Sequence, residues 1–252
     1  MRRVVVVAAM EREVELLVRD WERSSISDGA RSFAAFEKND RAVVISGVGR
    51  DHAEAAARAA LQPYQPDLLV SAGLAGALIR SLKAGSVVTP NVVVDAADGS
   101  EYRCSTEVGG VVGGGVLVSA SQIAGIEAKQ KLVERFHGLV VDMEAAGVAK
   151  AAQEAGVGFR CVKAISDEAD FVMPPLAQFV DAEGNFQSEK FAAWALVRPW
   201  QWARVIALGS NTRKAVKALC EWLEKNLSRS AVSAEIGRLK PAEFRDAVPG
   251  KR

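Results

Sequence analysis

The stretch from Val140 to Asp167 decides the fold: it runs VVDME over residues 140–144, then small residues, then VKAISD over residues 162–167. Each apolar run ends abruptly in a carboxylate, Glu144 in the first and Asp167 in the second. A continuous run of β-branched residues is typical of a strand that is buried on both faces. Acids just past the ends of two such strands lie where α/β proteins place their ligands. Glu144 and Asp167 are therefore the first candidates for a functional site.

The rest of the chain alternates between strand-like and helix-like segments. Apolar runs predict strands over residues 3–9, 32–36, 42–45, 68–71, 86–94, 116–119 and 159–165, and a further strand that ends at Asp142. Periodic segments predict helices over residues 11–21, 50–61 (ending before Pro63), 124–136, 144–155 and 211–226. Residues 72–76 are predicted to be a loop, and residues 98–115 a loop with an edge strand. This alternation predicts one three-layer α/β/α domain over residues 1–227, with a mixed, mainly parallel sheet, and a polar tail at 228–252 that frays.

Composition narrows the class of protein. The chain has 252 residues, of which 49% are hydrophobic and 25% charged, as in an ordinary soluble globular protein. A formal net charge of +1 argues against a nucleic acid as partner, because such a partner is held mainly through its backbone charge. The apolar run near the N-terminus is too short for a signal peptide, and no segment is long and apolar enough to span a bilayer.

The cysteines and histidines predict no metal site. Three cysteines are an odd number without metal-ligand spacing, and the two histidines complete no cluster with them. We therefore expect reduced structural thiols in a cytoplasmic protein, with no metal and no bound cofactor.

Two further segments leave alternatives open. The sequence MERE at 10–13 lies at the carboxyl end of the first predicted strand. Its two acids, Glu11 and Glu13, are either helix-start acids favoured by the macrodipole, or one of them is a general base that faces a crevice. The sequence GVG at 47–49 resembles the start of a dinucleotide fingerprint, but Arg50, Asp51 and His52 follow where the third glycine would be needed. A tight turn that brings the backbone close to another group is the simpler interpretation.

The two strand-end acids also have two interpretations each. Glu144 opens a helix and either interacts with its dipole or accepts two hydroxyl donors from a vicinal diol. Asp167 is not followed by a clear helix, so helix capping explains it less well. A carboxyl group there can give a proton to a heterocycle nitrogen.

Four motifs now fall in one order: AMEREV at 9–14, SGVG at 46–49, AGLAG at 72–76, and DMEAA at 142–146 with AISD at 164–167. Together they resemble the purine nucleoside phosphorylase/uridine phosphorylase superfamily, and within it the 5'-methylthioadenosine/S-adenosylhomocysteine nucleosidases. The resemblance implies a nucleoside phosphorylase-like fold and an enzyme that cleaves an N-glycosidic bond. A non-catalytic nucleoside-binding protein and a dinucleotide oxidoreductase are the competing classes.

The resemblance also implies a role for each matched residue. Glu13 matches the acid that activates water, Met143 lies under the ribose, Glu144 binds the ribose hydroxyls, and Asp167 assists the purine leaving group at N7. The region around the base and the nucleophile is expected to contain Gly73, Ile123, Ser166, Lys163 and Arg50.

The sequence departs from the nucleosidases at several positions. Leu74 replaces a serine, Lys163 replaces an arginine, QIA at 122–124 replaces a phenylalanine-containing base pocket, and residues 95–115 are compressed. These departures, with VDAADG at 94–99, ADFVMPP at 169–175 and DAEG at 181–184, look more like the hopanoid-associated phosphorylases. That branch implies release of adenine from adenosylhopane in hopanoid biosynthesis. The alternative is a 5'-methylthioadenosine/S-adenosylhomocysteine nucleosidase or a small-substrate purine nucleoside phosphorylase.

The nucleophile is either water or inorganic phosphate. Phosphate would need cations, for which Arg50, Arg80 and Lys163 are the candidates. Glu13 at the same face would repel a phosphate, at a cost of about 4 kcal/mol for a like-charge pair about 4 Å apart at an effective dielectric constant of about 20. We therefore favour hydrolysis, with phosphate as the alternative co-substrate.

Three tryptophans have two possible interpretations, and these imply different binding partners. Trp194, Trp200 and Trp202 pack in the core or an oligomer interface in one interpretation. In the other, they form an apolar surface that receives a lipid tail or makes a peripheral membrane contact. The expected partner is a small-molecule nucleoside, with or without a lipid tail, and the family resemblance implies a homo-oligomer, with a dimer favoured.

Overall fold

A computed structural model describes residues 3–105 and 114–227 of the chain, so the predicted tail at 228–252 lies outside the described residues. The strands are β1 (Val4–Ala8), β2 (Glu22–Ser27), β3 (Ser32–Lys38), β4 (Arg41–Ile45), β5 (Leu68–Ala77), β6 (Val87–Val88), β7 (Val92–Asp95), β8 (Glu101–Arg103), β9 (Val116–Ser119), β10 (Gly138–Asp142) and β11 (Gly158–Asp167). The helices are α1 (Glu11–Val18), α2 (Arg50–Tyr64), α3 (Ile126–Phe136), α4 (Ala145–Ala155), α5 (Ser188–Leu196) and α6 (Trp202–Asn226), with 3-10 turns η1 (Leu176–Phe179) and η2 (Pro199–Gln201).

The described strands form one mixed sheet in the order β2-β3-β4-β1-β5-β10-β9-β7-β8, and β11 pairs with both β5 and β6. The inner pairs β4–β1, β1–β5 and β5–β11 are parallel, as are β7–β9 and β9–β10. The other pairs are antiparallel. Strand β5 is the hub, because it pairs with β1, β10 and β11.

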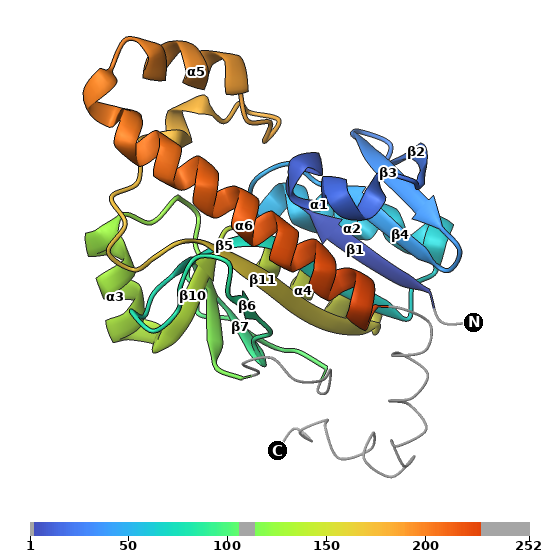
Figure 1. The fold of residues 1–252 in the computed structure, drawn as a ribbon. Coiled ribbons are helices and arrows are strands. Elements are labelled where there is room, and N and C mark those ends of the chain that lie inside the picture. Colours follow the sequence, from blue (N-terminus) through green and yellow to red (C-terminus); the bar gives the residue numbers. More distant parts are fainter. Residues whose placement is uncertain (1–2, 106–113, 228–252) are drawn as a thin grey trace.

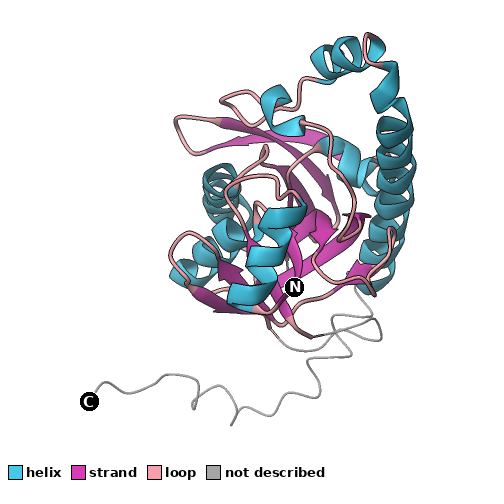
Figure 2. Ribbon diagram, turned by 90° about the vertical axis from the view of Figure 1, so that its left-hand side faces the viewer, coloured by secondary structure: helices cyan, strands magenta, loops and turns pink. Residues whose placement is uncertain are grey.

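Helices cover both faces of this sheet, as the sequence predicts. Helices α2 and α4 pack with one set of strand side chains, which includes Val5 and Leu69. Helices α1 and α6 pack with the alternate set, which includes Val6 and Val70. Figure 1 shows α6 crossing the front of the sheet, and in Figure 2 the same long helix runs down the right-hand side, with the strands to its left. The three-layer α/β/α architecture is confirmed.

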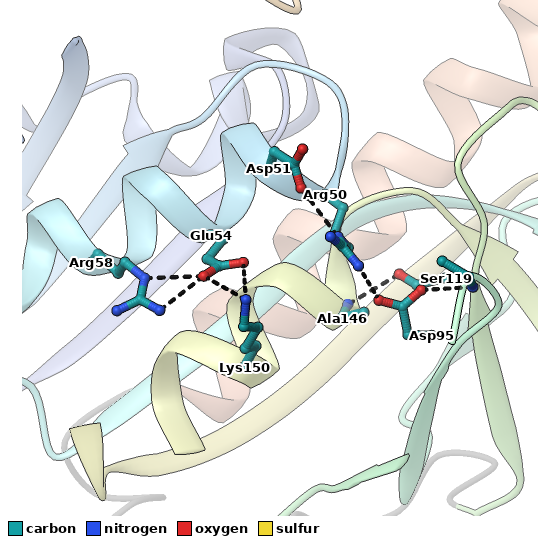
Figure 3. A network of polar contacts seen from close by, with 9 residues as sticks. Arg50, Asp51, Glu54, Arg58, Asp95, Ser119, Ala146 and Lys150 are labelled. Atoms are coloured by element: carbon teal, nitrogen blue, oxygen red, sulfur yellow. Dashed lines mark hydrogen bonds and ion pairs between the residues drawn. The ribbon is translucent and has the colours of Figure 1, made fainter. Parts of the chain in front are cut away.

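Helices α2 and α4 approach each other closely because small residues line their contact. A Cβ atom on Gly147 would lie 2.2 Å from the carbonyl oxygen of Arg50 and 2.9 Å from the amide nitrogen of Glu54. Polar contacts then tie the two helices together: Lys150 on α4 pairs with Glu54 on α2 at 3.1 Å (Figure 3). The close approach holds the N-termini of α2 and α4 side by side.

The structure corrects three details of the sequence-based prediction. Residues 72–76 are not a loop but continue strand β5, which pairs with β11 and β10 over this stretch. Helix α2 does not end before Pro63 but includes it, and ends where Gln65 adopts the left-handed conformation. Strand β2 was not predicted, because its sequence ERSSIS is polar and mostly exposed, as suits an edge strand.

The α2–α4 contact predicts the effect of a single methyl group. Gly147→Ala should lower the free energy of unfolding by about 3 kcal/mol, because the new Cβ overlaps the backbone of α2. Gly209→Ala is the matched control: Gly209 lies inside α6, and a Cβ there meets nothing within 4 Å. It should raise stability by up to about 1 kcal/mol through helix propensity. Urea denaturation of both variants measures the difference, and equal stability would contradict the close packing.

Candidate functional site

A cavity of about 430 Å³ opens at the carboxyl ends of β1, β5, β10 and β11. This edge is where the ends of parallel strands meet in an α/β sheet. Six of the nine predicted site residues line the cavity: Glu13, Ile123, Met143, Glu144, Ser166 and Asp167. The structure thus brings together side chains from four separate parts of the sequence.

Asp167 is held at the cavity by a bulge in β11. Ile165 pairs with Ala75 and Asp167 with Gly76, so Ser166 is an extra residue in the strand. Bulges of this kind redirect side chains beside functional sites. The hydroxyl of Ser166 donates to Oδ1 of Asp167 at 2.9 Å.

The other oxygen of Asp167 is occupied by Lys129, a residue that the sequence analysis missed. Its Nζ donates to Oδ2 of Asp167 at 2.5 Å and to the carbonyl oxygen of Glu168 at 2.9 Å. Lys129 is only 2% exposed although it lies on α3, whose other charged residues are at the surface. A lysine in an amphipathic helix ordinarily predicts a solvated side chain, so the sequence carries no signal for this contact.

Glu144 lies at the start of α4, where it accepts hydrogen bonds from the backbone. The N–H of Gly49 donates to its Oε1 at 2.9 Å, and that of Met143 donates to its Oε2 at 3.2 Å. The GVG segment is therefore a tight turn that presents an N–H group to this carboxylate. Desolvation raises the pKa of Glu144 to about 7, with smaller contributions from the nearby carboxylates of Asp142 and Glu13.

Glu13 is the third acid of the cavity. It is 3% exposed, and its Oε2 receives a long hydrogen bond of 3.4 Å from the N–H of Met10. Burial raises its pKa, while the positive charge of Lys163 acts in the opposite direction. A carboxylate whose pKa is raised by burial is a stronger base than an exposed one.

Lys163 lies behind the acids rather than on the cavity surface. Its Nζ is 2.8 Å from Oδ2 of Asp142, and both side chains are almost completely buried. Asp142 also accepts a hydrogen bond from the hydroxyl of Ser119 at 2.6 Å and from the N–H of Ala145 at 2.9 Å. Burial alone would lower the pKa of Lys163, but the carboxylate of Asp142 reverses the effect and raises it, so this lysine is a fixed positive charge.

The small residues of β5 make room for the acids. A Cβ atom on Gly73 would lie 3.0 Å from Oε2 of Glu13, and one on Gly76 would lie 2.8 Å from Oδ2 of Asp167. Gly73 itself does not line the cavity but lies beneath Glu13 and Lys163. The AGLAG segment is thus a small-residue strand under two carboxylates.

The arginines that were expected to bind a phosphate, Arg50 and Arg80, do not line the cavity. Arg50 does not line the cavity: its Nη1 is 2.6 Å from Asp95 and its Nε is 3.1 Å from Asp51 (Figure 3). Arg80 is exposed and also lies outside the lining. Among the described residues that line the cavity, positive charge comes from Lys129, which is paired with Asp167, and from Arg12, which lies over the ring of Phe186.

One end of the cavity is apolar. Side chains from the segment that contains η1 and α5 meet side chains of α6 there: Met173, Leu176, Val180, Phe186, Phe191, Val205 and Leu208. Trp194 packs with Phe179 and Phe191, at ring-centroid distances of 5.9 Å to each, which agrees with the packing interpretation. Trp200 and Trp202 do not pack in this way and are 70% and 46% exposed.

The part of the chain that the structure describes contains neither a metal-binding cluster nor a membrane-spanning helix. Within residues 3–105 and 114–227, no group of three or more His, Cys, Asp or Glu side chains is arranged to hold a metal ion. Over the same residues, no helix has the length and apolar character needed to cross a membrane.

The raised pKa of Glu144 predicts a dependence of stability on pH. Because the folded pKa of about 7 exceeds the ordinary 4.5, the stabilisation is fully present below about pH 4.5 and is lost as the pH rises through about 7. The stability of the native protein relative to Glu144→Gln should fall by about 2 to 3 kcal/mol between about pH 5 and about pH 8. The matched control is Glu168→Gln, where a hydrogen bond from Lys83 lowers the pKa, so no such loss is expected. Denaturation curves across this range measure both, and a flat difference for Glu144→Gln would contradict the assignment.

Comparison with known proteins identifies a family for the chain. The family model described as the phosphorylase superfamily matches residues 3–107 and 105–195. A 5'-methylthioadenosine/S-adenosylhomocysteine nucleosidase from Staphylococcus aureus (strain bovine RF122 / ET3-1) is 29% identical over 201 residues, which cover 66% of this chain and 86% of that protein.

Solved structures share the fold at lower identity. Futalosine hydrolase of Helicobacter pylori strain 26695 superposes with a TM-score of 0.67 at 19% identity, covering 92% of this chain and 98% of that one. A 5'-methylthioadenosine/S-adenosylhomocysteine nucleosidase from Neisseria meningitidis gives a TM-score of 0.65 at 20% identity, covering 88% and 97%. The expected nucleoside phosphorylase-like fold is therefore confirmed, and the chain belongs to the phosphorylase superfamily of nucleoside phosphorylases and nucleosidases.

Proposed function

We propose that this enzyme hydrolyses the N-glycosidic bond of a 5'-substituted adenine nucleoside and releases adenine. The observation that carries the proposal is the set of three acids, Glu13, Glu144 and Asp167, that face one cavity from different strand ends. A binding protein would need an acid for the ribose hydroxyls but would not need two more carboxylates placed for proton transfer. Glu13 and Asp167 are buried and Glu144 is half-buried, and gathering three carboxyl groups in one cavity costs free energy that catalysis explains.

Each acid has a separate role in the proposed reaction. Asp167 gives a proton to N7 of the purine while the bond between C1' and N9 breaks and its electron pair moves into the ring. Glu144 accepts hydrogen bonds from the ribose hydroxyls, and Met143 lies under the sugar. Glu13 takes a proton from the water that attacks C1', so the products are adenine and a 5-substituted ribose.

The residues around Asp167 fit this role. Ser166 and Lys129 bind its two oxygens, so the carboxyl group has a fixed orientation before substrate binds. The charge of Lys129 stabilises the carboxylate that forms when the proton leaves. Ile123, with Gln122, lines the part of the cavity that we assign to the base.

The charges at the cavity favour water over phosphate as the nucleophile. Arg50 is already paired with Asp95 and Asp51, and Lys163 with Asp142. Glu13 would repel a phosphate dianion at the same face, with a cost of the order of 4 kcal/mol. Arg12 is the remaining cation of the described lining, and it lies over Phe186.

Two classes of substrate fit the proposal: nucleosides with a small thioether substituent and nucleosides with a lipid substituent. The names of the curated relatives favour 5'-methylthioadenosine or S-adenosylhomocysteine, and one matching structure, a nucleosidase from Colwellia psychrerythraea 34H with a TM-score of 0.58, is a complex with adenine. Adenosylhopane is the second candidate. The apolar lining of the cavity favours it, because Leu176, Val205 and Leu208 offer a hydrocarbon surface in the cavity that also contains the three acids.

Neighbouring acids give a matched test of the chemistry. Asp167→Asn should lower kcat for adenine release by about 1,000-fold, because an amide cannot donate the proton to N7. Glu168→Gln changes the next residue, which pairs with Lys83 at 2.8 Å outside the cavity lining, and should keep nearly full activity. Adenine release, followed by chromatography, measures both. The proposal fails if the two variants behave alike.

The same assay separates the two nucleophiles and the two substrates. Release of adenine should proceed without phosphate, and strict dependence on phosphate would replace hydrolysis by phosphorolysis. Substrates with 5'-methylthio, homocysteinyl and long alkylthio groups should be compared under these conditions. A kcat/KM that rises with the length of the 5'-alkyl group supports a substrate with a large apolar 5' substituent, such as adenosylhopane. A kcat/KM that falls with alkyl length supports 5'-methylthioadenosine as the substrate.

A further inference from the structure

A cluster of large apolar side chains is exposed where α5, η2 and α6 meet. We call it the α5–α6 patch, and its members are Leu196, Val197, Trp200, Trp202 and Ile206, with exposures from 46% to 72%. Figures 1 and 2 show this part of the chain standing at one end of the molecule, beyond the sheet. A contiguous apolar surface of this kind marks an interaction site.

The surroundings of the patch are basic. Residues 187–214 contain five positively charged side chains and one acid, Glu189; the five are Lys190, Arg198, Arg204, Arg213 and Lys214. Arg198 is fixed beside the patch, with its guanidinium 4.9 Å from the ring of Trp194. Arg204 lies between Trp202 and Ile206 in the sequence and is exposed.

The patch adjoins the cavity. On α6, Val205 and Leu208 line the cavity, while Trp202 and Ile206 are exposed on the neighbouring face of the same helix. The apolar end of the cavity and the apolar outer surface are thus separated by the width of one helix. Neither Trp200 nor Ile206 lines the cavity, so they can be changed without touching the acids.

We infer that the α5–α6 patch binds the surface of an anionic lipid bilayer, with its tryptophans in the headgroup region. Indole rings and arginines around an apolar face are the side chains that bind at a membrane interface. A second copy of the chain fits less well, because a two-fold contact through this patch would bring Arg198 and Arg204 close to their own copies. Negatively charged headgroups instead complement those charges.

Co-sedimentation with lipid vesicles tests whether the α5–α6 patch binds a membrane. The protein should co-sediment with vesicles of phosphatidylcholine and phosphatidylglycerol, more weakly with phosphatidylcholine alone, and less at high salt. The double variant Trp200→Ser/Ile206→Ser should lose affinity by about a hundredfold or more, which is the effect of removing two buried apolar side chains. Arg204→Gln should lose about fivefold, and only on the anionic vesicles.

Leu16→Ser is the matched control, because Leu16 is 44% exposed on α1 outside the patch and should not affect vesicle binding. Adenine release from a water-soluble nucleoside should be unchanged in the double variant, so failure of the membrane contact is distinguishable from failure of the proposed chemistry. The inference is overturned if the native protein binds neither vesicle, if the double variant binds as well as the native protein, or if the double variant converts a native dimer to a monomer without any vesicle binding.

Discussion

The buried ion pair between Lys163 and Asp142 is the interaction on which the site depends. It joins β11 to β10, and through Asp142 it also reaches Ser119 and the first amide of α4. Three other carboxylates, those of Glu13, Glu144 and Asp167, lie at the same end of the sheet. Carboxylates gathered out of water repel one another, and an isolated buried charge is costly. A lysine with a raised pKa provides the fixed positive charge that makes the cluster tolerable.

The positions of the acids follow from the sheet around this pair. Strand β5 lies between β1 and β11. Because Gly73 and Gly76 have no side chain, they leave room for the carboxyl groups of Glu13 and Asp167, respectively. The bulge at Ser166 turns Asp167 toward the cavity, and the close contact of α2 with α4 brings the amide of Gly49 to Glu144. The acids therefore have different surroundings. Lys163 acts on both Glu13 and Glu144, Glu144 also accepts hydrogen bonds from two backbone amides, and Asp167 pairs with Lys129. Different surroundings are what allow similar carboxyl groups to take different roles.

The parts of this arrangement that depend on local sequence patterns could be predicted from the sequence. The parts that depend on contacts between residues far apart in the chain could not. Glu144 and Asp167 were predictable because a buried strand that stops at an acid is a local pattern, and the three-layer fold followed from the alternation of segments. Arg50 was expected in the nucleophile region but does not line the cavity, and its ion pair could not be predicted because its partner Asp95 is 45 residues away along the chain. The contact of Lys129 with Asp167 could not be predicted for the same reason, because only the tertiary fold brings α3 against the end of β11. The stretch at 72–76 was misassigned because glycine and alanine ordinarily signal a loop, whereas here they serve close packing under carboxylates.

Membership of the phosphorylase superfamily fits an enzyme that separates a base from its sugar, and we propose that the three acids divide the steps of that reaction among them. The measurement that tests this account most directly is a crystal structure with an adenine C-nucleoside, whose carbon–carbon link to the ribose cannot be cleaved. The account predicts N7 of the base within hydrogen-bond distance of Asp167 and the ribose hydroxyls on Glu144, with a water between Glu13 and C1'. A nucleoside bound in the reverse orientation, or outside this cavity, would contradict it.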